Sequence, residues 1–287
     1  MKCLVTGGSG FIGSHLVEEL INQRHQVTVL DKFKTKFLKN KKIKFFRTDL
    51  SSESKLKKAF KNQDIIFHFG GLSGINESMI NPLKTAEYNL MGTVRLLKLS
   101  KEFSIKRFIF ASTVYVNSEQ GSFYKSSKRA AEDFIEEYRK KYKLNFTILR
   151  FGTVYGERAS GENSIDKILN KALKNKKIIY SGNVKSIREY IHVKDAVKAT
   201  VEILKKKFMN KYINITGRRK IPVVKALNII RKELDLNTKI IYENKKMEGH
   251  YINSPDNFKI KKAKKIKIKK SIPFNIGIRE IIKSKRK

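Results

Sequence analysis

Short apolar segments alternate with amphipathic segments through the first half of the chain. Apolar residues recur every three or four positions in the segments between them, as in helices that bury one face. Near-continuous apolar strands separated by helices are typical of a parallel sheet that is covered on both faces. The predicted strands are 3–5, 26–30, 43–47, 65–69, 107–111 and 146–150, and the predicted helices between them are 16–21, 52–60, 83–103 and 124–142.

The pattern weakens beyond Gly156. Helices are predicted at 164–173, 193–204 and 223–234, strands at 178–180 and 212–215, and the last fifty residues are mixed. This is too little for an independent second domain, and it favours a small lobe over the strand ends, where ligands bind in such folds. We predict a sheet domain of residues 1–160, with 188–216 returning to it, and a substrate-binding lobe of 161–187 and 217–287.

A glycine-rich turn follows the first predicted strand. Gly8, Gly10 and Gly13 fit the spacing G-x-G-x-x-G between a strand and a helix, which is the context of a dinucleotide-binding turn. The helix after such a turn directs free N–H groups and its positive dipole end at phosphates. Many strand-to-helix turns need glycine for backbone reasons alone, so the motif needs support from elsewhere.

Asp31 supplies that support. It ends the second predicted strand, 18 residues after Gly13, where a carboxylate would accept a hydrogen bond from a ribose hydroxyl. A carboxylate there repels a 2′-phosphate, so NAD is favoured over NADP, although Lys32 and Lys34 would weaken this preference. The fold predicted from both features is α/β, a Rossmann-like doubly wound parallel sheet with a small C-terminal substrate-binding lobe.

Composition narrows the class of protein. A chain of 287 residues can bury a substantial core, and no apolar run approaches the length of a membrane span. The first residues run directly into the glycine turn, so we expect no secretory signal and a cytoplasmic protein. Cys3 is the only cysteine, which excludes an internal disulfide and a cysteine-based zinc site. His15, His25, His192 and His250 lack partners at metal-binding spacing, so no metal is expected.

The charge is unusual, because 64 Lys and Arg stand against 26 Asp and Glu, for a net charge of +38. We favour a solvated lysine-rich surface; a site for nucleic acid or another polyanion is the alternative. The densest run, 259–270, has eight lysines in twelve residues and is interpreted as an exposed edge strand, where lysine discourages pairing. Either way, so positive a field attracts anionic substrates such as nucleotide diphosphates.

Tyr124 and Lys128 are the candidate chemical groups. They lie four residues apart at the start of a predicted helix and therefore on one face. A phenol titrates near pH 10, but a nearby ammonium stabilises the phenolate and lowers the phenol pKa, which would make Tyr124 a usable acid and base. A hydroxyl from Ser112 or Thr113, after the fifth strand, could bind the same substrate oxygen.

With these motifs in order, the chain resembles the extended short-chain dehydrogenases/reductases, in the NAD-dependent epimerase/dehydratase group that acts on sugar nucleotides. The matching segments are Thr6–Gly13, Asp49–Leu50, Phe67–Gly71, Asn89–Thr93, Ala111–Tyr115, Tyr124–Lys128 with Glu132, Arg150–Gly156 and Arg188–Asp195.

The resemblance implies a role for each site residue. Tyr124 would exchange a proton with a sugar hydroxyl, Lys128 would hold the nicotinamide ribose and lower the pKa of Tyr124, and Thr113 or Ser112 would position the reacting oxygen. Thr153 and Arg188 would bind the nucleotide-diphosphate sugar. The helices 83–103 and 124–142 would form a homodimer. The implied NAD-binding residues are Gly7, Gly10, Phe11, Ile12, Gly13, Asp31, Asp49, Leu50, Phe69, Gly70, Gly71, Asn89, Tyr124 and Lys128.

The departures from the family pattern affect the predicted reaction. Only ten residues separate Thr113 from Tyr124, so a substrate-side loop is missing. Val114-Tyr115 stands where the 4,6-dehydratases of the family have an Asp-Glu pair, which disfavours dehydration. Thr153 replaces a common asparagine, and Lys245-Lys246 stands near the place of an arginine that often holds the second phosphate.

The favoured function is an NAD-dependent sugar-nucleotide epimerase similar to UDP-glucose 4-epimerase. A ketoreductase or dehydrogenase with the same residues is the main alternative. A non-catalytic relative that binds RNA or another polyanion is less favoured, because Thr113, Tyr124 and Lys128 are all present. His68 is expected to be a packing residue, and Asn89 to bond backbone groups and organise the site.

Overall fold

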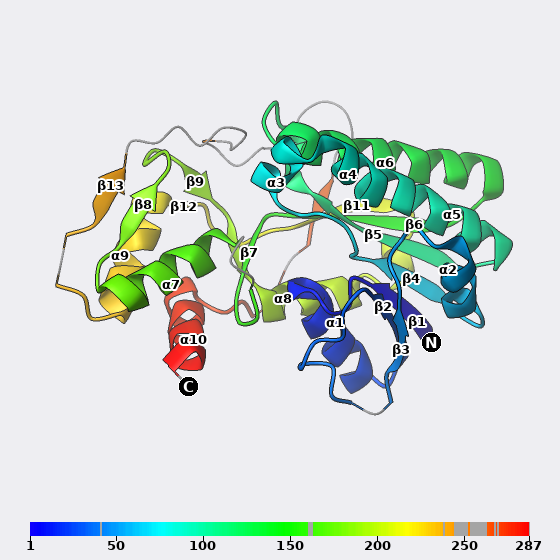
Figure 1. Cartoon of the computed structure of the whole chain (residues 1–287), viewed down its shortest axis with the longest axis horizontal. Helices are drawn as coiled ribbons and strands as arrows, with labels where there is room; N and C mark the ends of the chain where they lie inside the picture. The colour runs from blue at the N-terminus through cyan, green and yellow to red at the C-terminus, as the bar shows by residue number, and fades with distance from the viewer. Residues whose placement is uncertain are drawn as a thin grey trace.

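The computed structural model describes residues 1–40, 42–159, 163–237, 239–243, 252, 263–266, 268 and 270–286. Its centre is an eight-stranded sheet in the order β14-β11-β6-β5-β4-β1-β2-β3, and every neighbouring pair is parallel (Figure 1). The predicted α/β fold with a parallel sheet is confirmed. The strands are β1 (Lys2–Thr6), β2 (Gln26–Asp31), β3 (Lys44–Arg47), β4 (Ile65–His68), β5 (Arg107–Thr113), β6 (Phe146–Phe151), β11 (Lys211–Ile215) and β14 (Lys264–Lys265).

Helices cover both faces of this sheet. One apolar cluster joins the inner faces of α1 (Phe11–Asn22) and α8 (Val193–Glu202) to one side of the strands. A second cluster joins α2 (Glu53–Phe60), α5 (Gly92–Glu102) and α6 (Ser122–Tyr142) to the other side. The central strands are buried on both faces, which explains their near-continuous apolar sequences.

The helix predicted at 83–103 is interrupted. The structure has α4 (Pro82–Ala86), a five-residue π-helical turn (Glu87–Met91) and then α5, and α3 (Ile75–Ile80) precedes them. A π turn accommodates an extra residue in the helical path and is common at functional sites. Here it contains Asn89, which is completely buried.

A third apolar cluster lies beyond the carboxyl ends of the strands. It packs α7 (Ser164–Asn175), α9 (Val223–Glu233) and α10 (Phe274–Arg286) together, to the left of the sheet in Figure 1. The sequence pattern did not predict α10. Short paired strands complete this region: β7 (Thr153–Tyr155) with β10 (Tyr190–His192), β8 (Ile179–Ser181) with β13 (Ile241–Glu243), and β9 (Ile187–Arg188) with β12 (Ile221–Pro222).

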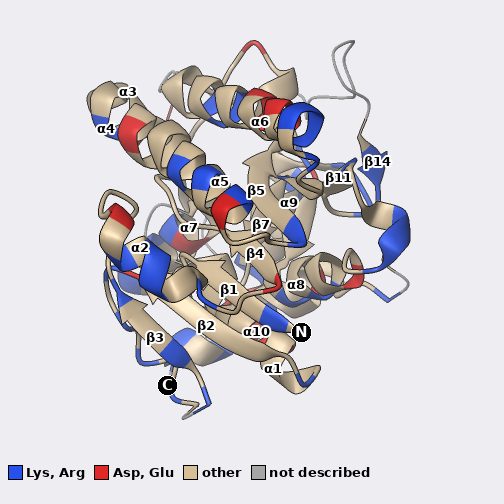
Figure 2. Ribbon diagram, turned by 90° about the vertical axis from the view of Figure 1, so that its right-hand side faces the viewer, with Lys and Arg blue, Asp and Glu red and all other residues tan. Residues whose placement is uncertain are grey.

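The lysine-rich run supplies the outer strand of the sheet. Lys264 and Lys265 are exposed in β14, whereas the flanking Ala263 and Ile266 are buried. This agrees with the predicted edge strand for that part of 259–270, and several residues of the run lie outside the described residues. Figure 2 shows Lys and Arg on helices and strands throughout the molecule. Among the described helices, none is long and apolar enough to cross a membrane.

Candidate active site

The glycine turn is packed too closely for side chains at two positions. Gly7 has φ +69°, and a Cβ there would lie 2.6 Å from the backbone of Phe69 and Gly70. A Cβ on Gly13 would lie 2.1 Å from the Gly7 carbonyl oxygen. Gly10 precedes α1, and no side chain caps its first N–H groups. The start of α1 is therefore a backbone surface that suits a pyrophosphate.

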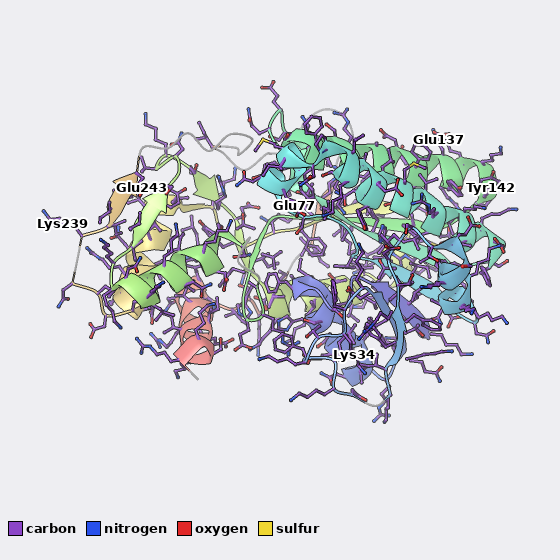
Figure 3. All side chains as sticks on the ribbon, in the orientation of Figure 1. Lys34, Glu77, Glu137, Tyr142, Lys239 and Glu243 are labelled. Atoms are coloured by element: carbon purple, nitrogen blue, oxygen red, sulfur yellow. The ribbon has the colours of Figure 1, made fainter. Side chains whose placement is uncertain are left out.

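Asp31 lies beside this turn at the end of β2. Its Oδ2 accepts a hydrogen bond from the Ser9 N–H at 2.9 Å, which fixes the carboxylate across from the glycines. Lys32 donates to the hydroxyl of Tyr88 and lies 3.8 Å from an Asp49 oxygen. Lys34, which projects from the loop after β2 in Figure 3, lies 5.9 Å from the Phe45 ring centre.

The neighbouring predicted cofactor residues line the same edge of the sheet. Asp49 accepts hydrogen bonds from Ser51, which lower its pKa. Leu50 is buried, and a Cβ on Gly92 would lie 2.9 Å from it. Phe11 and Ile12 at the start of α1, and Phe69 after β4, pack against the α1–α8 cluster.

His68 connects the glycine turn to the π-helical turn. Thr6 Oγ1 is 2.7 Å from His68 Nδ1, and His68 Nε2 is 3.0 Å from Thr93 Oγ1, which in turn donates to the Asn89 carbonyl at 2.6 Å. The Gly70 N–H donates to Thr6 Oγ1. Burial holds the pKa of His68 well below its usual value, so His68 is a neutral structural residue with its proton on Nε2.

Asn89 fixes the loop after β4. Its Oδ1 accepts from the Leu72 N–H at 2.8 Å, and its Nδ2 donates to the Leu72 carbonyl and to Ser127 Oγ at 3.0 and 3.1 Å. Gly71, with φ +142°, lies so close that a Cβ would be 2.5 Å from Asn89 Oδ1. The side chain thus bonds backbone groups, as the sequence analysis expected.

The structure brings Thr113 to Tyr124, and Lys128 lies one turn further along α6. Thr113 and Tyr124 share a side-chain hydrogen bond. Lys128 Nζ donates to the Ala111 carbonyl at 3.0 Å and lies 4.7 Å from the Phe110 ring centre. Burial lowers the pKa of Lys128 to about 8. Burial also raises the pKa of Tyr124 to about 12, partly offset by Thr113, which is opposite to the direction expected from Lys128.

Ser112 is directed elsewhere. Its hydroxyl donates to Glu132 Oε1 at 2.5 Å, and Glu132 forms a two-point ion pair with Arg150 through Nε at 3.0 Å and a terminal nitrogen at 2.6 Å. Each of these three residues is at most 3% exposed. Of the two candidate hydroxyls, only Thr113 therefore meets Tyr124. Glu132 belongs to the sequence motif of Tyr124 and Lys128, but that motif alone does not predict this network.

The two predicted substrate residues lie on short strands of the lobe. Thr153 is in β7 and pairs with Tyr190. Arg188 is in β9, and its guanidinium donates to the Ile187 and Ile252 carbonyls at 3.0 and 3.1 Å. Lys245 and Lys246 lie outside the described residues. In the described part of the chain, His, Cys, Asp and Glu form no group of three that could hold a metal ion.

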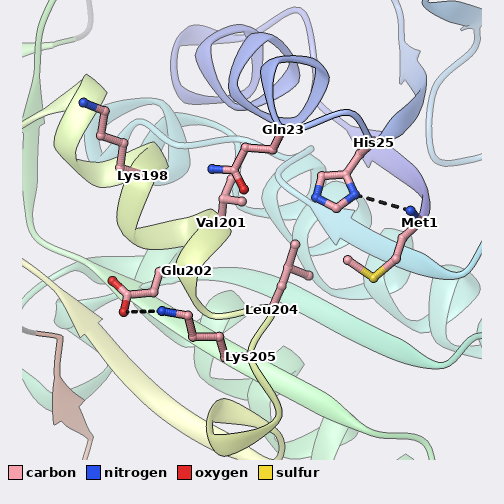
Figure 4. A pocket seen from close by; sticks show the side chains of 8 residues that line it. All are labelled: Met1, Gln23, His25, Lys198, Val201, Glu202, Leu204 and Lys205. Carbon is pink, nitrogen blue, oxygen red and sulfur yellow. Dashed lines mark hydrogen bonds and ion pairs between the residues drawn. The ribbon is translucent and has the colours of Figure 1, made fainter.

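A separate hollow lies at the opposite, amino-terminal end of the strands (Figure 4). It has a volume of about 340 Å³ and contains none of the predicted site residues. The Met1 amino group lies 3.4 Å from His25 Nδ1, and Lys205 pairs with Glu202. The candidate active site is thus at the carboxyl edge of the sheet, where parallel sheets bind ligands.

The doubly wound sheet with a glycine turn at a helix N-terminus places the chain in the class of Rossmann-like α/β proteins. Comparison with known proteins identifies the family: the model of the NAD dependent epimerase/dehydratase family matches residues 3–216, and the chain belongs to this family.

Its relatives carry more than one activity. A protein of Methanocaldococcus jannaschii, provisionally named a UDP-glucose 4-epimerase, is 30% identical over 97% of this chain and 96% of its own length. The human dTDP-D-glucose 4,6-dehydratase is 28% identical over 98% of this chain and 89% of its own. The crystal structure of UDP-glucose 4-epimerase from Thermotoga maritima, solved with UDP-glucose, has a TM-score of 0.88 at 24% identity, covering 100% and 99% of the two chains.

Proposed function

We propose that this protein is an NAD-dependent epimerase of a nucleotide-diphosphate sugar, similar to UDP-glucose 4-epimerase. The observation that carries the proposal is the hydrogen-bonded Thr113–Tyr124 pair with Lys128 one helical turn away, at the carboxyl edge of the sheet and two strands from the glycine turn. The names of the relatives support a sugar nucleotide as substrate.

The residues present fit NAD. A Cβ at Gly7 or Gly13 would clash with nearby backbone atoms, so glycine keeps this turn tight. The first N–H groups of α1 have no side-chain cap and would suit a pyrophosphate. Asp31 is held where it would accept hydrogen bonds from the adenosine ribose, and Lys128 where it would donate to the nicotinamide ribose. Bound NAD would supply the chemistry of accepting a hydride from the sugar and returning it.

Side chains of the protein would accept and return the proton of the sugar hydroxyl. Tyr124 would take the proton of the sugar hydroxyl as the carbonyl forms and return it when the hydroxyl is restored. Thr113 would orient the same oxygen through its hydroxyl. Burial raises the pKa of Tyr124 to about 12, so the phenol is protonated at neutral pH in the free protein.

Epimerisation is favoured over dehydration by the residues after Thr113. Loss of water from a sugar needs an acid and a base beside the departing hydroxyl. The short 3₁₀ turn Val114–Asn117 begins with a buried Val114 and continues with Tyr115, and it supplies no carboxylate. The similarity to dehydratase relatives therefore does not define this chain's reaction.

The helical lobe is our proposed substrate-binding region, predicted as residues 161–187 and 217–287, although Lys264–Lys265 of that range form β14 of the central sheet. It is built around its own apolar cluster beyond the strand ends, and Arg188 and Thr153 lie on short strands where it joins the sheet. In this proposal Arg188 binds a nucleotide phosphate.

The single cysteine, Cys3, is fully buried, which suits the cytoplasmic location that we propose.

We also propose a homodimer formed through α4, the following π turn and α6. Leu83 is 86% exposed and Met91 43%, while Phe123 and Phe134 on α6 are 50% and 43% exposed. Residues 123 and 134 are three helical turns apart and share a face. A Phe134→Glu variant should sediment as a monomer in analytical ultracentrifugation, and an unchanged sedimentation coefficient relative to a dimeric wild type would contradict this interface.

The test of function is incubation with UDP-, dTDP- and GDP-sugars, with and without added NAD, while sugar products and NADH are followed. The proposal expects an epimeric sugar without net NADH, and Tyr124→Phe should abolish it. Tyr142→Phe, at the exposed end of the same helix, is the matched control. Stoichiometric NADH, or a requirement for added NADH or NADPH, would instead identify a dehydrogenase or ketoreductase. Salt-dependent RNA affinity without turnover would favour the binding-protein alternative.

A further inference from the structure

Three successive residues of β5 each meet α6 through a different group. The Ala111 carbonyl accepts from Lys128, the Ser112 hydroxyl donates to Glu132, and the Thr113 hydroxyl pairs with Tyr124. On α6 these partners are spaced by four residues, so they form one inner stripe of the helix. Two of the three contacts belong to the proposed chemistry, and the Glu132 contact does not.

The Glu132 contact continues across the sheet. Both carboxylate oxygens bind the guanidinium of Arg150 on β6, and that guanidinium lies 4.7 Å from the ring centre of Tyr212 on β11. The Tyr212 hydroxyl donates back to Glu136, one turn further along α6. The inner face of α6 is thus fixed to β5 and β6 by buried polar contacts and to β11 by a part-buried one. The buried contacts are intolerant of displacement because unpaired buried charge is strongly unfavourable.

We infer that Glu132, with Arg150, is a positioning residue of the catalytic centre: it fixes α6 where Tyr124 meets Thr113, and it withdraws Ser112 from the reaction. The inference rests on the proposed function for its activity readout. In this inference the buried Glu132–Arg150 ion pair contacts neither substrate nor cofactor. It determines which of two adjacent hydroxyls, Ser112 or Thr113, takes part in the reaction.

Glu132 also acts on Lys128 electrostatically. The titratable and charged groups around Lys128 are Tyr124 and Glu132 on its own helix, His68 from β4 and, paired with Glu132, Arg150 from β6. His68 is neutral, so Glu132 supplies the negative charge that opposes the effect of burial on the Lys128 pKa. Removing that charge should release the Lys128 proton at a lower pH.

The first experiment measures NADH binding by fluorescence across neutral and alkaline pH. Wild-type affinity should fall as pH rises through about 8, where Lys128 loses its charge. In Glu132→Gln the midpoint should shift to lower pH by about one unit, since a neighbouring opposite charge has effects of this size. The double variant Glu132→Gln/Arg150→Gln removes both charges together, which avoids an unpaired buried guanidinium and keeps the turnover test valid if the single variant does not fold. Because two opposite charges are lost, its NADH midpoint should shift less than that of Glu132→Gln. Glu137→Gln, on the exposed side of α6, is the matched control.

The second experiment measures turnover. In the double variant kcat should fall about ten- to hundredfold with little change in KM, as expected for displaced reacting groups. Ser112→Ala should retain most of the wild-type kcat, whereas Thr113→Val should lose it. A Glu132→Gln variant with the wild-type NADH midpoint, a double variant with the wild-type kcat, or a Ser112→Ala variant as impaired as Thr113→Val, would overturn the inference.

The two readouts separate the possible failures. If wild-type protein binds NADH but converts no sugar, the proposed reaction is wrong, and the NADH midpoint of Glu132→Gln relative to wild type decides the role of Glu132. If wild-type protein does not bind NADH, the proposed function is wrong and the inference falls with it.

Discussion

Gly13→Ala tests whether the last glycine of the turn is required by packing. The added Cβ would lie 2.1 Å from the Gly7 carbonyl oxygen and 2.9 Å from the Gly7 carbonyl carbon. These are backbone atoms, and the same oxygen accepts a hydrogen bond from the Gly10 N–H at 3.0 Å. Relief of the clash therefore requires the turn or α1 to shift.

The expected loss of stability is moderate and measurable. Overpacking typically costs about 1–3 kcal/mol, and a backbone clash belongs at the upper end. Alanine regains about 1 kcal/mol as a better helix former than glycine, since residue 13 lies within α1. The net loss of about 2 kcal/mol corresponds to a fall in Tm of about 4–8 °C for a chain of this size.

Gly10→Ala is the matched control for this measurement. A Cβ there would lie 3.2 Å from the Gly7 oxygen, a contact that small adjustments relieve. Its Tm should stay close to the wild-type value, while NADH binding should weaken because the methyl group stands where the pyrophosphate would approach. Thermal unfolding and NADH fluorescence measure both effects. A Gly13→Ala protein with the wild-type Tm would refute the packing argument, and so would equal losses of stability in the two variants.

Three further predictions follow from buried or charged groups. His68→Gln should make the free energy of unfolding less dependent on pH below pH 6.5. In the wild type, the unfolded chain binds a proton there that the folded protein does not bind at His68, so its free energy of unfolding falls by about 1.4 kcal/mol more per pH unit than that of the variant. Urea unfolding at several pH values would measure this difference. Asn89→Ala should lose about 2 kcal/mol in urea unfolding because both backbone groups of Leu72 lose their partner, and unchanged stability would contradict the assigned contacts. Asp31→Asn should raise the affinity for NADPH relative to NADH about tenfold, and an unchanged ratio in binding titrations would place cofactor selection elsewhere.

The sequence predicted those parts of the molecule that depend on local periodicity. The strand predicted at 107–111 contains the apolar run 108–111, and the observed strand extends it to Thr113. The four-residue spacing of Tyr124 and Lys128 places both on one helix face. The helix Phe274–Arg286 was missed, although Phe274, Ile278, Ile281 and Ile282 have the spacing of an amphipathic helix and are buried accordingly. The two- and three-residue strands of the lobe are too short for any period to be recognised.

The π turn had no comparable signal. Leu83 to Phe103 has helical periodicity throughout, and the extra residue in the turn is determined by the contacts of Asn89 with the loop after β4, which are tertiary. The direction of the Tyr124 pKa was wrong for a related reason. Spacing brings an ammonium near a phenol, but it does not reveal that burial of the phenol has the larger effect.

The sequence alone does not decide between Ser112 and Thr113, whereas the structure does. Both hydroxyls lie at the end of β5, and from sequence either could serve the chemistry. What separates them is Glu132, which lies 20 residues from Ser112 in sequence and is itself oriented by Arg150 from the next strand. Tyr124, Lys128 and Glu132 are spaced by four residues and therefore share one helix face. Their separate roles depend on which atom of β5 each side chain contacts. The same four-residue spacing thus places both the proposed reacting residues and the residue that positions them on α6. Only their contacts with the sheet distinguish the two roles.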